Sequence, residues 1–163
     1  MNPLVVIPAR MESERLPGKP LADIHGEPMI VHVWRRGMEA DVGPVVVACA
    51  EPEIAAAIEA AGGRAVLTRP DHASGSDRVF EALNLADPER KHDAIVNIQG
   101  DLPTVEAEVV RASLVPLADG SVDIATLAAT ITEPAERANP NVVKAVIGLA
   151  AGQTVGRAHY FTR

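Results

Sequence analysis

The sequence predicts an α/β fold in which helices cover both faces of a mostly parallel sheet. Two observations carry this prediction. Short β-branched runs alternate along the chain with longer segments of helical periodicity, which is typical of strand–helix–strand units. The composition is 47% hydrophobic but only 2% aromatic, so the core must consist of Val, Ile, Leu and Ala. A chain of 163 residues has the length of one domain and can bury such a core.

The first four strands are expected where the aliphatic runs are nearly continuous. Such runs are typical of strands that are buried on both faces of a parallel sheet. The runs cover residues 4–9, 45–49, 64–68 and 93–101.

Four helices are expected between and after these strands. Pro28 stands at a plausible start of the first helix, and Gly62 with Gly63 ends the second. Ser74, followed three residues later by Asp77, has the pattern of a capping box at the start of the third helix. The expected helices cover residues 28–40, 51–63, 74–86 and 106–117.

The last part of the chain predicts further strands. Residues 123–131 read as a fifth strand, and residues 141–161 as two strands joined by a glycine-containing turn. The chain stops at "HYFTR" with no closing element. We expect a single domain over residues 1–163 that is incomplete at its C-terminus.

Charge and composition exclude several classes of function. A net charge of −7 argues against a nucleic-acid-binding protein, which usually needs a basic face. No apolar stretch approaches the roughly 20 residues that a membrane-spanning helix needs, and no signal peptide is visible. The single cysteine, Cys49, lies in an aliphatic run and is expected to be buried. We expect a cytoplasmic protein that is not inserted in a membrane.

The loop after the first strand carries three cations in an otherwise acidic chain. Arg10, Arg15 and Lys19 could neutralise a polyphosphate, and Gly18 would allow the backbone to approach it. The segment is not a Walker A loop, because proline rather than Ser or Thr follows the lysine. The alternative is a solvated loop whose cations pair with Glu12 and Glu14.

Two more loops at the expected carboxyl ends of strands carry polar clusters, and such ends are where parallel sheets bind ligands. Asp101 follows the fourth strand and is a candidate Mg²⁺ ligand, since Mg²⁺ takes only one or two protein carboxylates. Its alternative role is to cap the next helix. The segment "TRPDHASGSDR" could present Arg69, His72 and the N–H groups near Ser74 to a nucleotide.

Several long motifs, in order, resemble the 3-deoxy-manno-octulosonate (KDO) cytidylyltransferase family. They are "IPARMESERLPGKPLADIHGEPMIVHV", "TRPDHASGSDR", "IVNIQGDLP", "NPNVVKAV" and "YFTR". The resemblance spans essentially the whole chain. It implies a three-layer, Rossmann-like nucleotidyltransferase fold with a mostly parallel, mixed sheet. The implied reaction is CTP plus KDO to CMP-KDO plus pyrophosphate with Mg²⁺, a step of lipopolysaccharide biosynthesis.

The resemblance also implies roles for individual residues. Arg10 and Lys19 would be catalytic, stabilising the charge that builds on the leaving pyrophosphate. Asp101 would bind Mg²⁺, while Gln99 and Arg163 would bind the sugar acid. The nucleotide would be bound by Pro8, Ala9, Arg10, Arg15, Lys19, Arg69 and Ser74.

The sequence departs from the family pattern at two points. Leu102 replaces a glutamate that the family usually carries in this motif. Family members also continue beyond the last residue here, into a part that would hold a second Mg²⁺ ligand and much of the contact of a homodimer. One alternative is a sialic-acid cytidylyltransferase, which uses the same fold and CTP. Because of the missing part, another is a truncated nucleotide-binding fragment without activity. A sugar-1-phosphate nucleotidyltransferase would predict a G-x-G-T loop that this sequence lacks.

Overall fold

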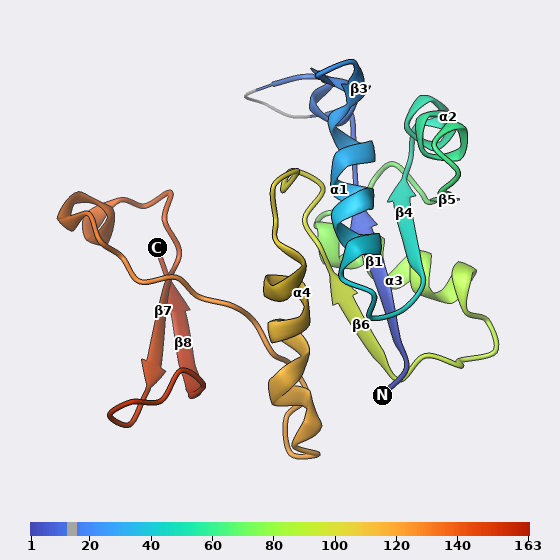
Figure 1. The fold of residues 1–163 in the computed structure, drawn as a ribbon. Helices are drawn as coiled ribbons and strands as arrows, with labels where there is room; N and C mark the ends of the chain where they lie inside the picture. Colours follow the sequence, from blue (N-terminus) through green and yellow to red (C-terminus); the bar gives the residue numbers. More distant parts are fainter. Residues whose placement is uncertain (13–15) are drawn as a thin grey trace. The chain divides into compact units, whose positions relative to one another are not determined.

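The computed structural model describes residues 1–12 and 16–163 of the chain. These residues divide into two compact units, Met1–Val115 and Pro116–Arg163. Figure 1 shows the course of the chain through both. The two units are described separately below.

The first unit is built on a four-stranded sheet in which every strand pair is parallel. The strand order is β5-β4-β1-β6, so β1 is an inner strand with a partner on each side. Val5 is paired with Val45 of β4 and with Val96 of β6. The strands are β1 (Pro3–Pro8), β4 (Val45–Cys49), β5 (Arg64–Leu67) and β6 (Ala94–Asn97). A separate small ladder joins β2 (Asp23–Ile24) to β3 (Glu27–Pro28).

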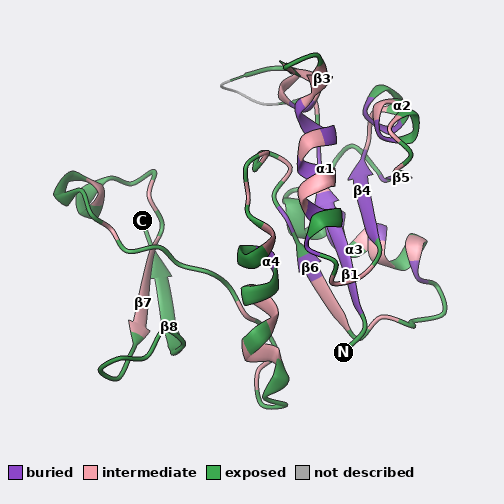
Figure 2. Cartoon of the chain, viewed as in Figure 1, coloured by how far each residue is buried: buried purple, intermediate pink, exposed green. Residues whose placement is uncertain are grey.

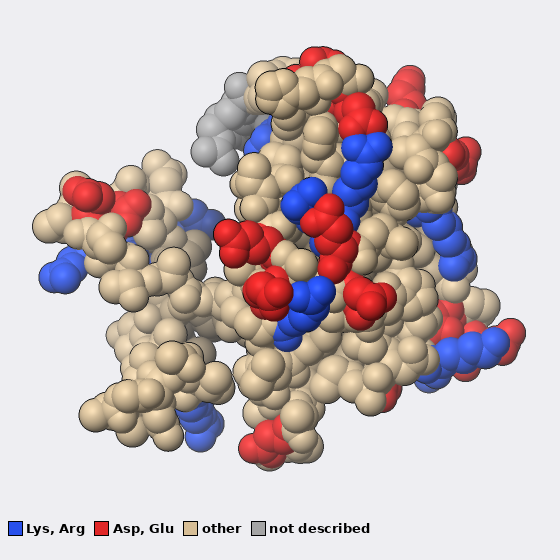
Figure 3. All heavy atoms as spheres, viewed as in Figure 1, with Lys and Arg blue, Asp and Glu red and all other residues tan. Residues whose placement is uncertain are grey.

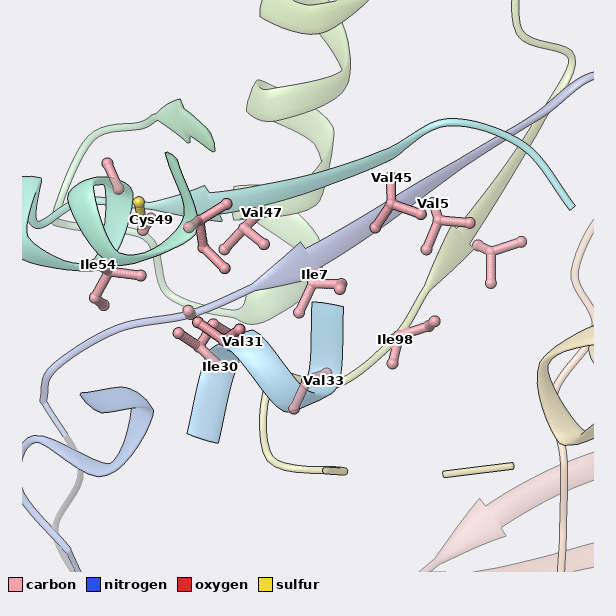
Figure 4. Packing of buried hydrophobic residues seen from close by; sticks show 14 of the residues in the cluster. Val5, Ile7, Ile30, Val31, Val33, Val45, Val47, Cys49, Ile54 and Ile98 are labelled. Atoms are coloured by element: carbon pink, nitrogen blue, oxygen red, sulfur yellow. The ribbon is translucent and has the colours of Figure 1, made fainter. Parts of the chain in front are cut away.

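Helices cover both faces of this sheet, because successive side chains of a buried strand point to opposite sides. Val5 and Ile7 face one hydrophobic cluster, which includes residues of α1, α2 and α4. Figure 4 shows Ile7 directed toward Ile30 and Val33 of α1. Leu4 and Val6 face a second cluster, to which α3 contributes. The helices are α1 (Met29–Glu39), α2 (Pro52–Ala60), α3 (Gly75–Ala86) and α4 (Ala107–Leu114).

These three layers confirm the predicted fold class and its four strand–helix alternations. The buried parts in Figure 2 follow β1 and β4, in agreement with their continuous aliphatic sequences. Cys49 is buried as expected, and burial raises the pKa of its thiol to about 11. The cysteine is therefore a packing residue rather than a reactive thiolate.

The second unit contains one antiparallel strand pair and two 3-10 turns. Strands β7 (Lys144–Gly148) and β8 (Arg157–Thr162) are the two strands expected in residues 141–161. They form a sheet of their own, with a register shift between Val146 and Ile147. The 3-10 turns are η2 (Val115–Ala118), which begins at the last residue of the first unit, and η3 (Pro134–Ala138).

The prediction of a fifth strand at residues 123–131 is wrong, since this segment forms no strand. Ile124 is 87% exposed and Leu127 is 49% exposed. An extended segment becomes a strand only when a neighbouring backbone accepts and donates its hydrogen bonds. This segment pairs with no strand in the described part of the chain, although its residues have high strand propensity.

Basic and acidic side chains are interspersed on the face of the molecule that Figure 3 shows. Several are joined in pairs on or beside α1 and α4. Arg36 pairs with Glu39 at 2.7 Å and Arg111 pairs with Glu108 at 2.9 Å. Within the described ranges, no helix is long and apolar enough to span a bilayer.

Asp87, at the C-terminal end of α3, makes stability depend on pH. Its carboxylate accepts hydrogen bonds from the backbone N–H groups of His92 and Lys91, at 2.8 and 2.9 Å. These bonds hold the pKa of Asp87 below its ordinary value. The stabilisation is therefore complete above the unfolded-state pKa of about 3.9 and disappears as pH falls through the lower folded-state value. We expect Asp87→Asn to lower the free energy of unfolding at pH 7, measured in urea, and to lose this effect in strong acid. An equal loss of unfolding free energy at pH 7 and in strong acid would contradict this role of the Asp87 carboxylate.

Candidate active site

A pocket lies at the carboxyl ends of the neighbouring strands β1 and β6, beside the start of α3. Its volume is about 150 Å³. This is the edge of a parallel sheet at which ligands usually bind, because the strands end there and helices begin. The lining residues are Pro8, Ala9, Arg10, His72, Ser74, Gly75, Arg78 and Gln99.

Gly100 allows two walls of this pocket to approach one another, whereas a side chain at Gly75 would make only ordinary contacts there. A Cβ at Gly100 would lie 2.5 Å from the carbonyl oxygen of Pro8, so only glycine lets the turn after β6 pack against the end of β1. A Cβ at Gly75 would lie 3.5 Å from the Pro8 ring and 4.0 Å from the Gln99 side-chain oxygen. The first turn of α3, the end of β1 and Gln99 are thus held together.

The loop after β1 is closed by backbone hydrogen bonds. The N–H of Gly18 donates to the carbonyl of Met11 at 3.0 Å, and the N–H of Met11 donates to Glu51 Oε1 at 3.0 Å. Gly18 has a φ of 73°, in the left-handed region. Among the residues that the structure describes, a Cβ there would meet only Met11 Cε, at 3.8 Å. Glycine is thus required at this position by the backbone angle.

Lys19, which follows this turn, forms an ion pair with Asp101. The distance from Lys19 Nζ to Asp101 Oδ2 is 2.7 Å, and the side chains are 32% and 51% exposed. Lys19 therefore pairs with the candidate metal ligand rather than with Glu12, while Glu14 lies outside the described residues. Asp101 caps no helix, because α4 begins at Ala107 after Glu106. The contact leaves Asp101 Oδ1 without a recorded hydrogen bond in residues 1–12 and 16–163.

The third wall of the pocket is the N-terminal part of α3. Ser74 is the N-cap residue, and its hydroxyl accepts a hydrogen bond from the Asp77 N–H at 3.2 Å, which confirms the predicted cap. Arg78, one turn further along, is only 3% exposed. Its Nη1 donates to Thr68 Oγ1 at 2.7 Å and to the carbonyl of Arg69 at 3.2 Å.

Glu81, on the next turn, accepts hydrogen bonds from the same loop. Its two carboxylate oxygens lie 3.3 and 3.2 Å from the backbone nitrogen of Arg69, and one of them bonds Nε2 of His72. Burial raises the pKa of Glu81, but the hydrogen bonds from His72 and the Arg69 backbone outweigh it, so the pKa lies below its ordinary value. Glu81 is therefore ionised at neutral pH.

The structure brings together some of the predicted site residues and separates others. Five of them line the pocket: Pro8, Ala9, Arg10, Ser74 and Gln99. Lys19 and Asp101 form their own ion pair, and Arg69 is outside the pocket lining with a side chain that is 68% exposed. Arg15 lies outside the described residues. Arg163 belongs to the second unit, where its Nη1 lies 3.4 Å from the carbonyl oxygen of Pro140.

Sequence reasoning missed Arg78 as a lining residue and Glu81 as the residue that holds Arg69 and His72. A signal was available, because residues 74, 78 and 81 are spaced by four and three positions. On a helix that begins at Ser74, this spacing places all three on one face.

Together, the parallel sheet between two helical layers and the polar pocket at its carboxyl edge define a three-layer α/β protein. The comparison with solved structures identifies this fold as a nucleotidyltransferase fold. The structure of CMP:2-keto-3-deoxy-manno-octonic acid synthetase complexed with CTP matches with a TM-score of 0.86 and 39% identity, covering 99% of this chain and 64% of that one. A Mycobacterium tuberculosis protein in complex with manganese matches with a TM-score of 0.52 at 17% identity, covering 72% of this chain and 60% of that one, so it supports the fold alone.

The chain belongs to the cytidylyltransferase family, whose family model matches residues 4–163. Two curated relatives are named 3-deoxy-manno-octulosonate cytidylyltransferase. The one from Paramagnetospirillum magneticum is 63% identical over 100% of this chain and 66% of its own length. The one from Rhodospirillum centenum is 64% identical over 99% of this chain and 63% of its own length. The chain thus spans about two thirds of the length of these relatives.

Proposed function

We propose that this chain is the CTP-binding part of a KDO cytidylyltransferase, acting in lipopolysaccharide biosynthesis in the cytoplasm. The observation that carries the proposal is the pocket at the end of β1, which gathers five of the residues that the family resemblance implies. Identities above 60% to relatives of that name support the choice of substrate.

In the proposed reaction, the anomeric hydroxyl oxygen of KDO forms a bond to the α-phosphorus of CTP. The bond from that phosphorus to the bridging oxygen of the β-phosphate breaks, pyrophosphate leaves and the hydroxyl proton passes to solvent. Such a transfer requires in-line positioning and neutralised phosphate oxygens more than covalent help from the protein. Arg10 in the pocket and Lys19 beside it would supply the positive charge.

Asp101 fits the role of a Mg²⁺ ligand. It offers an exposed carboxylate, and Mg²⁺ requires only one or two of these from a protein. The bound ion would neutralise phosphate oxygens and orient the triphosphate. Because Lys19 occupies Asp101 Oδ2 in the structure, we propose that the ammonium group transfers to the triphosphate when CTP binds. A role for Arg163 in holding the sugar-acid carboxylate and a homodimer of the full-length protein are further parts of the proposal.

The direct test is pyrophosphate release by the chain from CTP, KDO and Mg²⁺. We expect release that depends on all three, and a preference for KDO over sialic acid. A preference for sialic acid would assign the chain to that class of cytidylyltransferase. CTP binding without release would identify a nucleotide-binding part that needs further sequence for catalysis.

A further inference from the structure

Residues 68–72, between β5 and α3, reach the rim of the pocket at His72 and are held by side chains of α3. Arg78 donates to the carbonyls of Arg69 and Pro70, at 3.2 and 3.4 Å, while Glu81 accepts from the Arg69 N–H. One helix thus satisfies both the donors and the acceptors of a loop that has no regular secondary structure. A loop held in this way can place a side chain with the accuracy that recognition of a ligand requires.

The side chain that this rim places in the pocket wall is His72. Its side chain is only 5% exposed, and it lines the pocket. Its Nε2 is bonded to Glu81, which is ionised and can only accept a hydrogen bond. The neutral imidazole must therefore carry its proton on Nε2, which leaves Nδ1 with a free lone pair.

The Nδ1 atom remains available to a ligand. It has no recorded hydrogen bond within the described part of the chain. Among the described residues, the side-chain nitrogen and oxygen atoms that are fully buried without a hydrogen bond are Trp34 Nε1 and Glu51 Oε2. Nδ1 of His72 is not one of these atoms, so it is accessible to solvent. Because Glu81 fixes the ring through Nε2, Nδ1 of His72 is well placed to accept a hydrogen bond from a donor on the ligand.

We propose that His72 is a specificity-determining residue, which selects cytosine over uracil by accepting a hydrogen bond from the exocyclic amine. The two bases differ at this position, where cytosine carries an amine donor and uracil carries a carbonyl acceptor. Two acceptors would face each other in a uracil complex, and a site built to bind a donor strongly rejects an analogue that lacks it. The inference rests on the proposed function, because it places the base of a CTP substrate in this pocket.

The test is calorimetric titration of the chain with CTP and with UTP, in Mg²⁺ at about pH 8.5, above the ordinary imidazole pKa of about 6.5. We expect the wild type to bind CTP at least about tenfold more tightly than UTP. His72→Phe keeps a ring but removes the acceptor, so it should weaken CTP binding by about tenfold and change UTP binding little. The matched control is His92→Phe, because His92 lies before β6 at the opposite end of the sheet, and it should bind both nucleotides as the wild type does.

His72→Gln provides a second variant with the opposite effect. Its amide carries both an acceptor and donors, so it should keep CTP binding and improve UTP binding. An unchanged CTP preference in folded His72→Phe or His72→Gln protein would overturn the inference. Equal binding of the two nucleotides by the wild type would overturn it while leaving a nucleotide-binding function standing. Binding of neither would refute the proposed function, and the inference with it.

Discussion

Lys19→Ala is expected to lower the rate of pyrophosphate release by about 100- to 1000-fold. A cation positioned where charge develops on the leaving group stabilises the transition state by that order of magnitude. The fold should remain intact, because Lys19 lies in a half-exposed ion pair and such pairs contribute little to stability. The CTP dissociation constant should rise as well, since the same ammonium group contacts the triphosphate in the proposed complex.

Lys91→Ala is the matched control for this variant. Lys91 forms an ion pair of the same length, 2.7 Å, with Glu89, in the loop before β6 and away from the pocket. Its loss should leave both rate and affinity unchanged. A Lys19→Ala protein that releases pyrophosphate within twofold of the wild-type rate would remove Lys19 from the catalytic machinery.

Gly100→Ala is expected to lower both the free energy of unfolding and the affinity for CTP. The added methyl group would stand 2.5 Å from the carbonyl oxygen of Pro8 and 3.5 Å from Ile30 Cδ1. Because the first of these atoms belongs to the backbone of an inner strand, the turn before Asp101 must move away from β1. Overpacking of this kind typically costs about 1–3 kcal/mol of unfolding free energy. CTP binding should fall by at least tenfold, because Gln99 and Asp101 move with the turn.

Gly43→Ala is the control that separates the effect on stability from the effect on CTP binding. A Cβ at Gly43 would lie 2.1 Å from the carbonyl oxygen of Pro3, at the amino end of β1 and so at the edge of the sheet opposite the pocket. It should lower the unfolding free energy in urea while the folded protein still binds CTP. If Gly100→Ala and Gly43→Ala proved equal in CTP affinity, the packing of Gly100 would have no specific part in the site.

Local signals predicted the parallel sheet and its helices. The aliphatic runs that became β1 and β4 are buried on both faces, and Ser74 caps α3 through a hydrogen bond within four residues of sequence. The failed strand at residues 123–131 has a different cause. Its formation depends on a partner that is distant in sequence, and propensity carries no information about that partner.

The same limit applies to the candidate site. Local sequence singles out Lys19 and Asp101 separately, but their contact joins residues 82 positions apart and follows only from the strand order. The support of the pocket rim by Arg78 and Glu81 could have been predicted from the helical spacing of these residues after Ser74. The direction of residues 68–72, which turn back toward α3, could not be predicted from the sequence.

The position of β1 between β4 and β6 has a consequence for motion at the pocket. Pro8 and Ala9 continue a strand whose backbone is bonded on both sides, so the amide protons of Val5 to Ile7 should exchange with solvent only when the whole first unit opens. Lys19 instead lies on a short 3-10 turn, Lys19–Leu21, where its side chain forms the half-exposed ion pair with Asp101, and opening there requires far less free energy. The nucleotide would thus contact a rigid strand end and a more mobile lysine. Hydrogen–deuterium exchange should therefore be slow at Ile7 and fast at Lys19, 12 positions further along the chain.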